Sequence, residues 1–333
     1  MSVTLATSNF TQFEKGFFIT EAVIGLDTIN KGLAFLASGV KNDKYTFPVL
    51  SVTPKLKAYT ATPGAETNST VLSNRDVTLG KFQSYEEFDP SIFENHWHQD
   101  QLSDKLLARG LPATFTNYLG GFYTQKTLVP VELMIHSGST SYVTTTGGSA
   151  AVGGANESLV HFDGLIKIAL NAATPALQVA TPVALTAVNI IAKMEAAKNI
   201  MPKALLSSAD RYTRLKYIMS VEDSQKYEEA LTASSFKNND TTEKGINKYK
   251  GYEVVTCAGL PENTFYFCEA TSDVRSNIQL AVTAIDNLSF KIDRLQNNSE
   301  LYFYKMVAKM GVGIAKPQEF VIYTTKVLAN FTA

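Results

Sequence analysis

The sequence predicts an α+β fold, in which helices and strands are intermixed without the regular alternation of a doubly wound sheet. Residues 45–88 contain strand-like runs divided by prolines and a turn sequence, and residues 112–137 have the length and apolar spacing of one long helix. The last quarter of the chain returns to strand-like runs, such as GYEVVTCAG, TFYFCEA and LYFYKMVAKMGVGIA. A parallel sheet with a helix after every strand does not fit this order.

The composition indicates a folded protein with little net charge. Of the 333 residues, 45% are hydrophobic and 18% are charged, which provides enough apolar surface to bury a core. The chain contains 30 basic and 31 acidic residues, and positive and negative charges are mixed along it. Because there is no basic stripe, sequence-specific contact with nucleic acid is not expected, whereas a net charge near zero favours association between copies.

The sequence shows no sign of a targeting segment or a membrane span, and it contains two cysteines. The N-terminal sequence MSVTLATSNFTQFEKG has no basic region followed by an apolar run, so no signal peptide is expected. No apolar run reaches the ~18 residues that cross a membrane. The two cysteines, Cys257 and Cys268, lie in strand-like apolar runs, and we expect them to be buried and reduced in a cytosolic setting.

The first part of the chain is expected to contain an arm and a long hairpin. Residues 1–44 are too mixed in character to close a core alone, so they are predicted to pack as an arm against something else. Residues 45–88 form two strand-like runs around the turn sequence TPGAETNS, with polar residues on both faces. An isolated hairpin of this kind is only marginally stable in water, so it needs a partner surface.

One long helix is predicted from Pro112, a favourable first helical position, to the residue before Gly138. With about 25 residues, it would measure roughly 37 Å. Gly120, Gly121 and Pro130 are expected to bend it. Its buried face is predicted to consist of Phe115, Leu119, Phe122, Val129 and Leu133.

The sequence contains no group of residues with the spacing of a catalytic, cofactor or metal site. His96 and His98 are predicted at a helix end, where side chains two residues apart point about 200° apart and cannot share a metal ion. His136 and His161 lack a nearby Ser, Cys or Asp constellation and are interpreted as surface or loop histidines. The glycine-rich residues 147–154 lack the Lys-Ser/Thr of a phosphate-binding loop. An enzyme, a cofactor and a metal are therefore not expected.

The order of the parts resembles that of a known family. A polar hairpin is followed by DVTLGKFQSYEEFDPSIFENHW, and a long helix then opens at LPATFTNYL and ends at ELMIHSG. A Gly/Ser/Thr segment at residues 138–158, expected to be flexible, leads to FDGLIKI, a mixed α/β insert and the closing strands MVAKMGVGIAKPQEFVIYTT. Across about residues 45–325, this ordered set resembles the major capsid proteins of tailed bacteriophages, which have the Hong Kong 97 capsid fold.

The resemblance implies a division of the chain into five parts. In chain order they are an N-terminal arm at 1–44, an extended hairpin (the E-loop) at 45–88, a peripheral domain at 89–164 with its spine helix at 112–137, an axial domain at 165–282, and return strands of the peripheral domain at 283–333. The segment from Asp76 to Asp100 would then be the return strand of the hairpin and its junction with the core, which is a place for assembly rather than for catalysis.

The resemblance also implies a function and its partners. Such proteins form pentamers and hexamers that build the icosahedral or prolate head shell around double-stranded DNA, first in the host cytoplasm and then as the virion. Scaffolding, portal and cement proteins are further implied partners, the DNA is held without sequence-specific contacts, and no membrane is involved. The residues expected at the subunit interface are Lys55, Lys57, Tyr59, Arg75, Gly120 and Gly121.

Two points stay open on the sequence alone. Some members of the family cross-link neighbouring subunits through a Lys–Asn bond, but the matching Asn and the assisting Glu cannot be identified here, so Lys55 and Lys57 are interpreted as solvated lysines. An encapsulin-like cargo compartment, which shares the fold, and another phage structural protein such as a tail-tube subunit are alternative functions.

Overall fold

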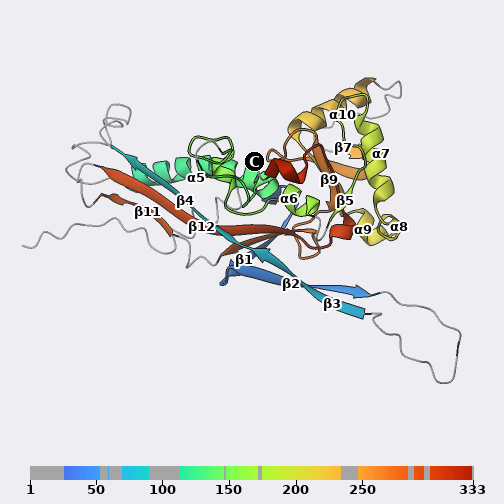
Figure 1. Cartoon of the computed structure of the whole chain (residues 1–333), viewed down its shortest axis with the longest axis horizontal. Helices are drawn as coiled ribbons and strands as arrows, with labels where there is room; N and C mark the ends of the chain where they lie inside the picture. Colours follow the sequence, from blue (N-terminus) through green and yellow to red (C-terminus); the bar gives the residue numbers. More distant parts are fainter. Residues whose placement is uncertain are drawn as a thin grey trace, which may run out of the picture.

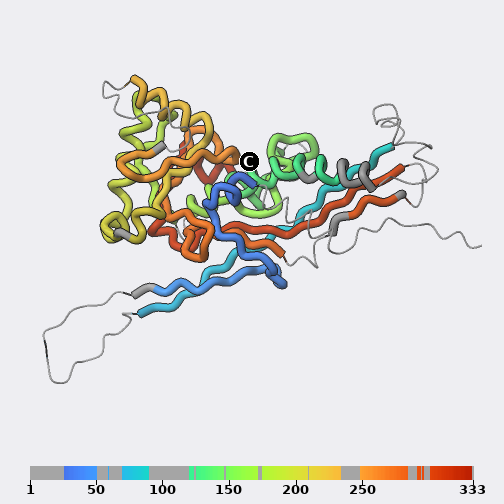
Figure 2. Tube along the Cα trace, turned by 180° about the vertical axis from the view of Figure 1, so that it is seen from behind, coloured from blue at the N-terminus to red at the C-terminus, as the bar shows by residue number. Residues whose placement is uncertain are grey.

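The computed structural model describes the chain in segments. These are residues 26–52, 59, 70–89, 113–145, 148–171, 175–233, 247–283, 289–295 and 301–331. Within them the strands form a five-stranded sheet, a six-stranded sheet and a two-stranded hairpin. The five-stranded sheet extends into the elongated end of the molecule, the six-stranded sheet lies at the other end with most of the helices, and the hairpin projects away from both (Figures 1 and 2).

The five-stranded sheet is built around its longest strand, β12 (Tyr302–Ile314). Along one edge of β12 runs β4 (Gly80–Phe88), in antiparallel register. Along the other edge, β11 (Ser289–Arg294) and β10 (Ile278–Thr283) also pair antiparallel with β12, and β1 (Phe35–Val40) pairs parallel with β10. One continuous strand thus joins a segment from the first third of the chain to segments from its last quarter.

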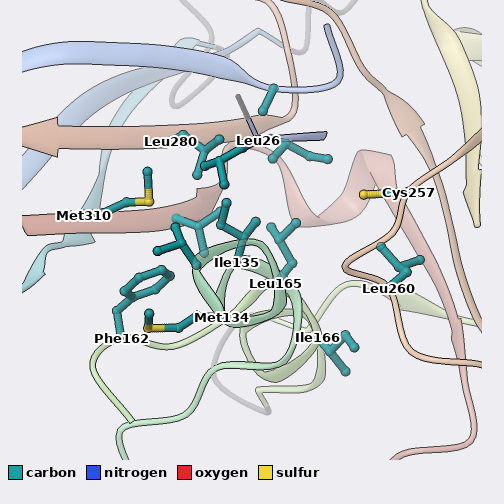
Figure 3. Packing of buried hydrophobic residues seen from close by; sticks show 14 of the residues in the cluster. Leu26, Met134, Ile135, Phe162, Leu165, Ile166, Cys257, Leu260, Leu280 and Met310 are labelled. Carbon is teal, nitrogen blue, oxygen red and sulfur yellow. The ribbon is translucent and has the colours of Figure 1, made fainter. Parts of the chain in front are cut away.

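Helix α5 (Ala113–Ser137) covers one face of this sheet. Buried and half-buried side chains alternate along the first part of β12, as the period of a strand with one covered face requires. The buried set is Tyr302, Tyr304, Met306, Ala308 and Met310. These side chains pack in one core with Val131, Met134 and Ile135 of α5. Figure 3 shows Met310, Met134 and Ile135 within this core. The ring of Tyr123 stacks on that of Tyr304, with centroids 4.4 Å apart.

The length of α5 agrees with the prediction, but its buried face does not. The helix has 25 residues and continues through the two glycines and the proline. Phe122, Val129 and Leu133, predicted to be buried, are 47%, 62% and 40% exposed. Apolar residues occupy more than one side of this helix, so their spacing fits two faces and does not decide which one meets the sheet. The side chains of Phe115 and Leu119 lie outside the described residues.

The end of α5 requires a glycine. The amide of Gly138 donates to the carbonyl of Met134 at 2.9 Å. A Cβ at this position would lie 2.5 Å from the carbonyl oxygen of Phe162 and 2.6 Å from that of Met134, so a larger residue would force the two segments apart. Residues 138–158 then fold into hydrogen-bonded turns in their described part, for example from the Ala150 amide to the Val143 carbonyl at 3.0 Å. The described part of this predicted Gly/Ser/Thr loop is thus closed by its own backbone hydrogen bonds.

The six-stranded sheet has a core on each face. Its strand order is β5 (Leu177–Gln178), β13 (Phe320–Thr324), β9 (Thr264–Glu269), β6 (Leu215–Met219), β8 (Tyr252–Thr256) and β7 (Asn247–Tyr249). Every residue of β9 and β13 is buried. On one face, Tyr217 stacks on Phe267 at 4.2 Å in a core shared with helices α7 (Ile190–Ile200) and α10 (Val221–Ala233). The other face joins the core of α5 and the five-stranded sheet.

Several short helices complete the described residues. They are α2 (Asp27–Asn30), η2 (Glu157–Leu159), α6 (Leu165–Leu170), α8 (Lys203–Leu206), α9 (Ala209–Tyr212), η4 (Pro317–Glu319) and η5 (Leu328–Phe331). Of these, α2 and α6 contribute Leu26, at the N-cap of α2, Leu165 and Ile166 to the core beside α5 (Figure 3). Within the described residues, no helix combines the length and the apolar character that crossing a bilayer requires.

The strand pairing departs from the predicted division of the chain. β1 was assigned to the arm and β10 to the axial domain, but both belong to the five-stranded sheet. β4, expected as the end of the hairpin, pairs with β12, so the hairpin consists of β2 (Lys44–Val52) and β3 (Thr70–Thr78). β13, expected with the peripheral return strands, pairs with β9 of the six-stranded sheet. Local patterns predict strands, whereas their partners are distant in sequence and are chosen by the tertiary fold.

Candidate functional site

The hairpin presents an exposed apolar surface. Its base packs in a small core in which Phe47 and Val77 contact Ala281. Toward its far end, Leu50 and Leu72 are directly opposite each other in the antiparallel register and are 58% and 67% exposed. Partners in such a register point to the same face, so the two leucines form one apolar patch. Among the described residues, β2 and β3 pair only with each other.

The second exposed surface is the side of α5 that faces away from the sheet. It contains Phe122, Val129 and Leu133, and the ammonium of Lys126 lies 5.6 Å from the centroid of the Phe122 ring. Three large apolar side chains along one helix, each at least 40% exposed, are typical of a surface that another molecule covers. We call these residues the outer face of α5.

The predicted interface residues do not form one site within a subunit. Lys55 and Lys57 lie outside the described residues, and Tyr59 is 96% exposed. Arg75, on β3, is half-buried and lines a groove of about 720 Å³ together with His161, and burial lowers the pKa of its guanidinium. Gly120 and Gly121 belong to α5, whose first half lies far from β3 in both views (Figures 1 and 2).

Replacing Gly121 by alanine is expected to stabilise the dissociated subunit by up to about 1 kcal/mol, because alanine is preferred to glycine in a helix interior. A Cβ at this position would meet nothing within 4 Å beyond the helix's own backbone. If the glycine pair contacts a neighbouring subunit, as predicted, the same variant should assemble less well. Thermal unfolding and particle sedimentation measure the two effects. A stabilised variant with normal assembly would contradict an interface role for Gly121.

A buried polar cluster lies where α5 meets the loop after β8. Glu132 and His136 are one turn apart on α5, and with Thr28 of α2 and Cys257 they are at most 6% exposed. The sulfur of Cys257 lies 3.2 Å from Glu132 Oε1 and 3.3 Å from His136 Nε2. Glu132 Oε1 and His136 Nε2 are 3.5 Å apart. Thr28 donates its amide, at 3.1 Å, and its hydroxyl to Glu132 Oε1.

The charges within this cluster stabilise one another. Burial raises the pKa of Glu132, but hydrogen bonds from His136, Thr28 and Cys257 outweigh it, so the pKa is lowered overall. Burial lowers the pKa of His136, but its contacts with Cys257 and Glu132 raise it to about 9. The opposite directions of the two shifts agree with a carboxylate beside an imidazolium. The second carboxylate oxygen, Glu132 Oε2, is buried without a hydrogen bond.

This cluster was not predicted from the sequence. We interpreted His136 as a surface or loop histidine without a cysteine nearby, and this is wrong, because the fold brings in Cys257 from 121 residues away. The available signal was the Glu-x-x-x-His spacing, which places both side chains on one face of a helix. Both cysteines are free and buried, as expected. His96 and His98 lie outside the described residues.

Comparison with known proteins gives matches in structure only. No protein-family model and no curated protein sequence matches the chain. Among solved structures, the procapsid of satellite phage P4 matches with a TM-score of 0.63 and 10% identity, covering 98% of this chain and 94% of that chain. A structure from Gordonia phage Cozz matches with a TM-score of 0.52 and 12% identity, covering 90% and 86%. The capsid of Ralstonia phage GP4 matches with a TM-score of 0.50 and 10% identity, covering 88% and 87%.

The chain has the Hong Kong 97-like phage capsid fold. This confirms the fold class and the resemblance predicted from the order of its parts. At 10–12% identity, the similarity to these capsid structures establishes the fold alone. The features of this chain that bear on its function are therefore the fold and the two exposed surfaces, the hairpin and the outer face of α5.

Proposed function

We propose that the protein is the major capsid protein of a tailed bacteriophage. Its copies assemble through pentamers and hexamers into the head shell that encloses double-stranded DNA. The observation that carries the proposal is the match to the P4 procapsid, in which 98% of this chain and 94% of that chain are aligned. The structural similarity thus extends over almost the whole chain and is not limited to one domain.

The hairpin supports assembly from identical copies. Leu50 and Leu72 form an apolar patch that no described part of the same subunit covers. The outer face of α5 offers a second apolar patch in the same chain. Two different patches on one chain suit a heterologous contact, in which the hairpin of one subunit lies across α5 of the next and the contact repeats around a ring.

A structural role fits the chemistry of the interior better than an enzymatic one. Among the described residues, the cluster of Glu132, His136 and Cys257 brings together a carboxylate, an imidazole and a thiol, and none of these residues is more than 6% exposed. A substrate could not reach them without opening the core. The proposed activity is therefore assembly, with the virion as the final location and the host cytoplasm as the place of assembly.

Further partners follow from this function. Scaffolding, portal and cement proteins would contact the assembled shell, and DNA would be held inside without sequence-specific contacts, in keeping with 30 basic and 31 acidic residues. An encapsulin-like compartment is the alternative that the same fold allows. The content of purified particles separates the two, because a phage head contains nucleic acid, whereas a cargo compartment contains a protein.

Placing a charge in the apolar patch of the hairpin tests whether it acts in assembly. Leu72 is 67% exposed, so the ammonium of Leu72→Lys lies in water in a free subunit and is buried only if a neighbouring subunit covers the patch. We expect a folded subunit that melts cooperatively but forms no closed particles in sedimentation or electron microscopy. Particles of normal size would contradict the role of the hairpin. Loss of the cooperative melt would show that the hairpin supports its own subunit instead.

A further inference from the structure

We propose that Glu132, His136 and Cys257 bind one Zn²⁺ ion in the interior of the subunit, with the hydroxyl of Thr28 hydrogen-bonded to the Glu132 carboxylate. An imidazole nitrogen, a thiolate sulfur and a carboxylate oxygen are the ligand types that zinc takes in proteins. The three donor atoms all lie within 4.8 Å of one another, and all three residues are buried. This inference does not depend on the proposed function, because the site lies within one subunit.

The distances between the donor atoms fit a tetrahedral ion. With zinc bonds of about 2.3 Å to sulfur and roughly 2.0–2.2 Å to nitrogen and oxygen, ligands at tetrahedral angles lie about 3.3–3.7 Å apart. The observed separations are 3.3 Å for Cys257 Sγ to His136 Nε2, 3.2 Å for Cys257 Sγ to Glu132 Oε1, and 3.5 Å for Glu132 Oε1 to His136 Nε2. An ion therefore needs movements of only a few tenths of an ångström.

The surroundings of these ligands are those of a metal centre. Thr28 Oγ1 lies 3.2 Å from His136 Nε2 and 3.5 Å from Cys257 Sγ, and its hydroxyl donates to Glu132 Oε1, so it orients the carboxylate beside the other two ligands. The other ring nitrogen of His136, Nδ1, lies 3.5 Å from the hydroxyl of Tyr266. A partner at this second nitrogen fixes the ring orientation and is common for histidines that bind zinc. The Thr28 amide holds the carboxylate in the same way.

A bound cation also accounts for the unpaired oxygen of Glu132. Its Oε2 atom is buried and has no hydrogen bond, an arrangement that is costly for a carboxylate in a protein interior. A divalent ion next to the carboxylate balances this charge, and Oε2 can turn toward the ion as a second ligand atom. Cys257 would bind as the thiolate and His136 through a deprotonated Nε2, so that both side chains release a proton to solvent as the bonds to zinc form.

The fold holds the two ligand-bearing segments close together. In the loop after β8, a Cβ on Gly259 would lie 2.7 Å from the Glu132 carbonyl oxygen and 2.8 Å from His136 Cδ2, so only glycine allows this approach to α5. Zinc at this point would link α5 to the six-stranded sheet. Because no ligand is more than 6% exposed, the ion would be structural, with no open position for a substrate.

The test is a metal titration of the purified full chain after dialysis against a chelator. We expect one Zn²⁺ per chain and a higher melting temperature when zinc is added. Co²⁺ in place of zinc should give the absorption of a tetrahedral ion with a thiolate-to-cobalt charge-transfer band. A chelated protein that stays folded and takes up neither metal stoichiometrically would overturn the proposal, leaving the cluster as a hydrogen-bonded network.

Two cysteine variants form a matched pair for the same titration. Cys257→Ser should abolish the charge-transfer band and weaken metal binding by at least ~100-fold. Cys268→Ser changes the other free buried cysteine, which lies outside the cluster, and should keep both the band and the affinity. A band that survives in Cys257→Ser would refute the site. If Cys257→Ser does not fold, the cobalt spectrum of the unaltered chain still tests the site. A spectrum without the charge-transfer band would exclude a thiolate ligand and contradict the proposal.

Discussion

Replacing Ile135 by alanine is expected to destabilise the subunit by about 2–5 kcal/mol. Ile135 is completely buried on α5 and packs in the core that α5 shares with β12 (Figure 3). The side chain removed would leave a cavity between a helix and a sheet, neither of which can easily close over it. Urea unfolding of the dissociated subunit measures the change in the free energy of unfolding.

Val129→Ala is the matched control on the same helix. Val129 is 62% exposed, so truncating its side chain should change the free energy of unfolding by no more than ~0.5 kcal/mol. The pair distinguishes the two possible faces of α5. A large loss at Val129 with a small one at Ile135 would mean that the helix is rotated toward the face that the sequence spacing predicted.

Replacing Val129 by lysine is expected to abolish shell formation while leaving the subunit folded. In a free subunit the new ammonium group would lie in water, as the 62% exposure of this position indicates. If the neighbouring subunit covers the outer face of α5, the charge is buried without a partner at every copy of that contact, at a cost of several kcal/mol each. Light scattering should detect soluble subunits and no particles.

The control for this charge is Val188→Lys. Val188 is 94% exposed and shortly precedes α7, a helix that packs in the core of the six-stranded sheet and not beside the outer face of α5. A lysine there tests whether any added charge disturbs assembly, and we expect particles in normal yield. Normal particles from Val129→Lys would show instead that the outer face of α5 is not an interface.

The sequence predicts the elements of this fold better than their packing. The helix expected at 112–137 is found at Ala113–Ser137, because a favourable first residue and a closing glycine mark its ends. The face that it buries was predicted wrongly, because apolar residues on both sides give two acceptable stripes and the sheet selects one. Val129 lies on the exposed stripe, whereas Val131 and Ile135 lie on the stripe that meets β12, a strand far along the chain.

The strand partners and the buried cluster could not be predicted from the sequence, because both depend on contacts between residues far apart in the chain. β9 and β13 are recognisable as strands from their apolar runs, but nothing local indicates that they pair with each other. The cluster depends on Thr28 and Cys257, which lie 104 and 125 residues from Glu132. The sequence shows only the Glu-x-x-x-His spacing of α5. This spacing predicts two side chains on one face of the helix, but it does not predict the residues that complete the cluster.

The central claim is that this chain builds closed shells, and electron microscopy of the purified full chain tests it most directly. The fold of the P4 procapsid is shared over 98% of this chain, and two apolar surfaces are exposed on each subunit. We predict closed particles of uniform diameter in which the subunits cluster around fivefold and sixfold axes. A preparation that contains only dispersed subunits, or only open tubes, would contradict the claim.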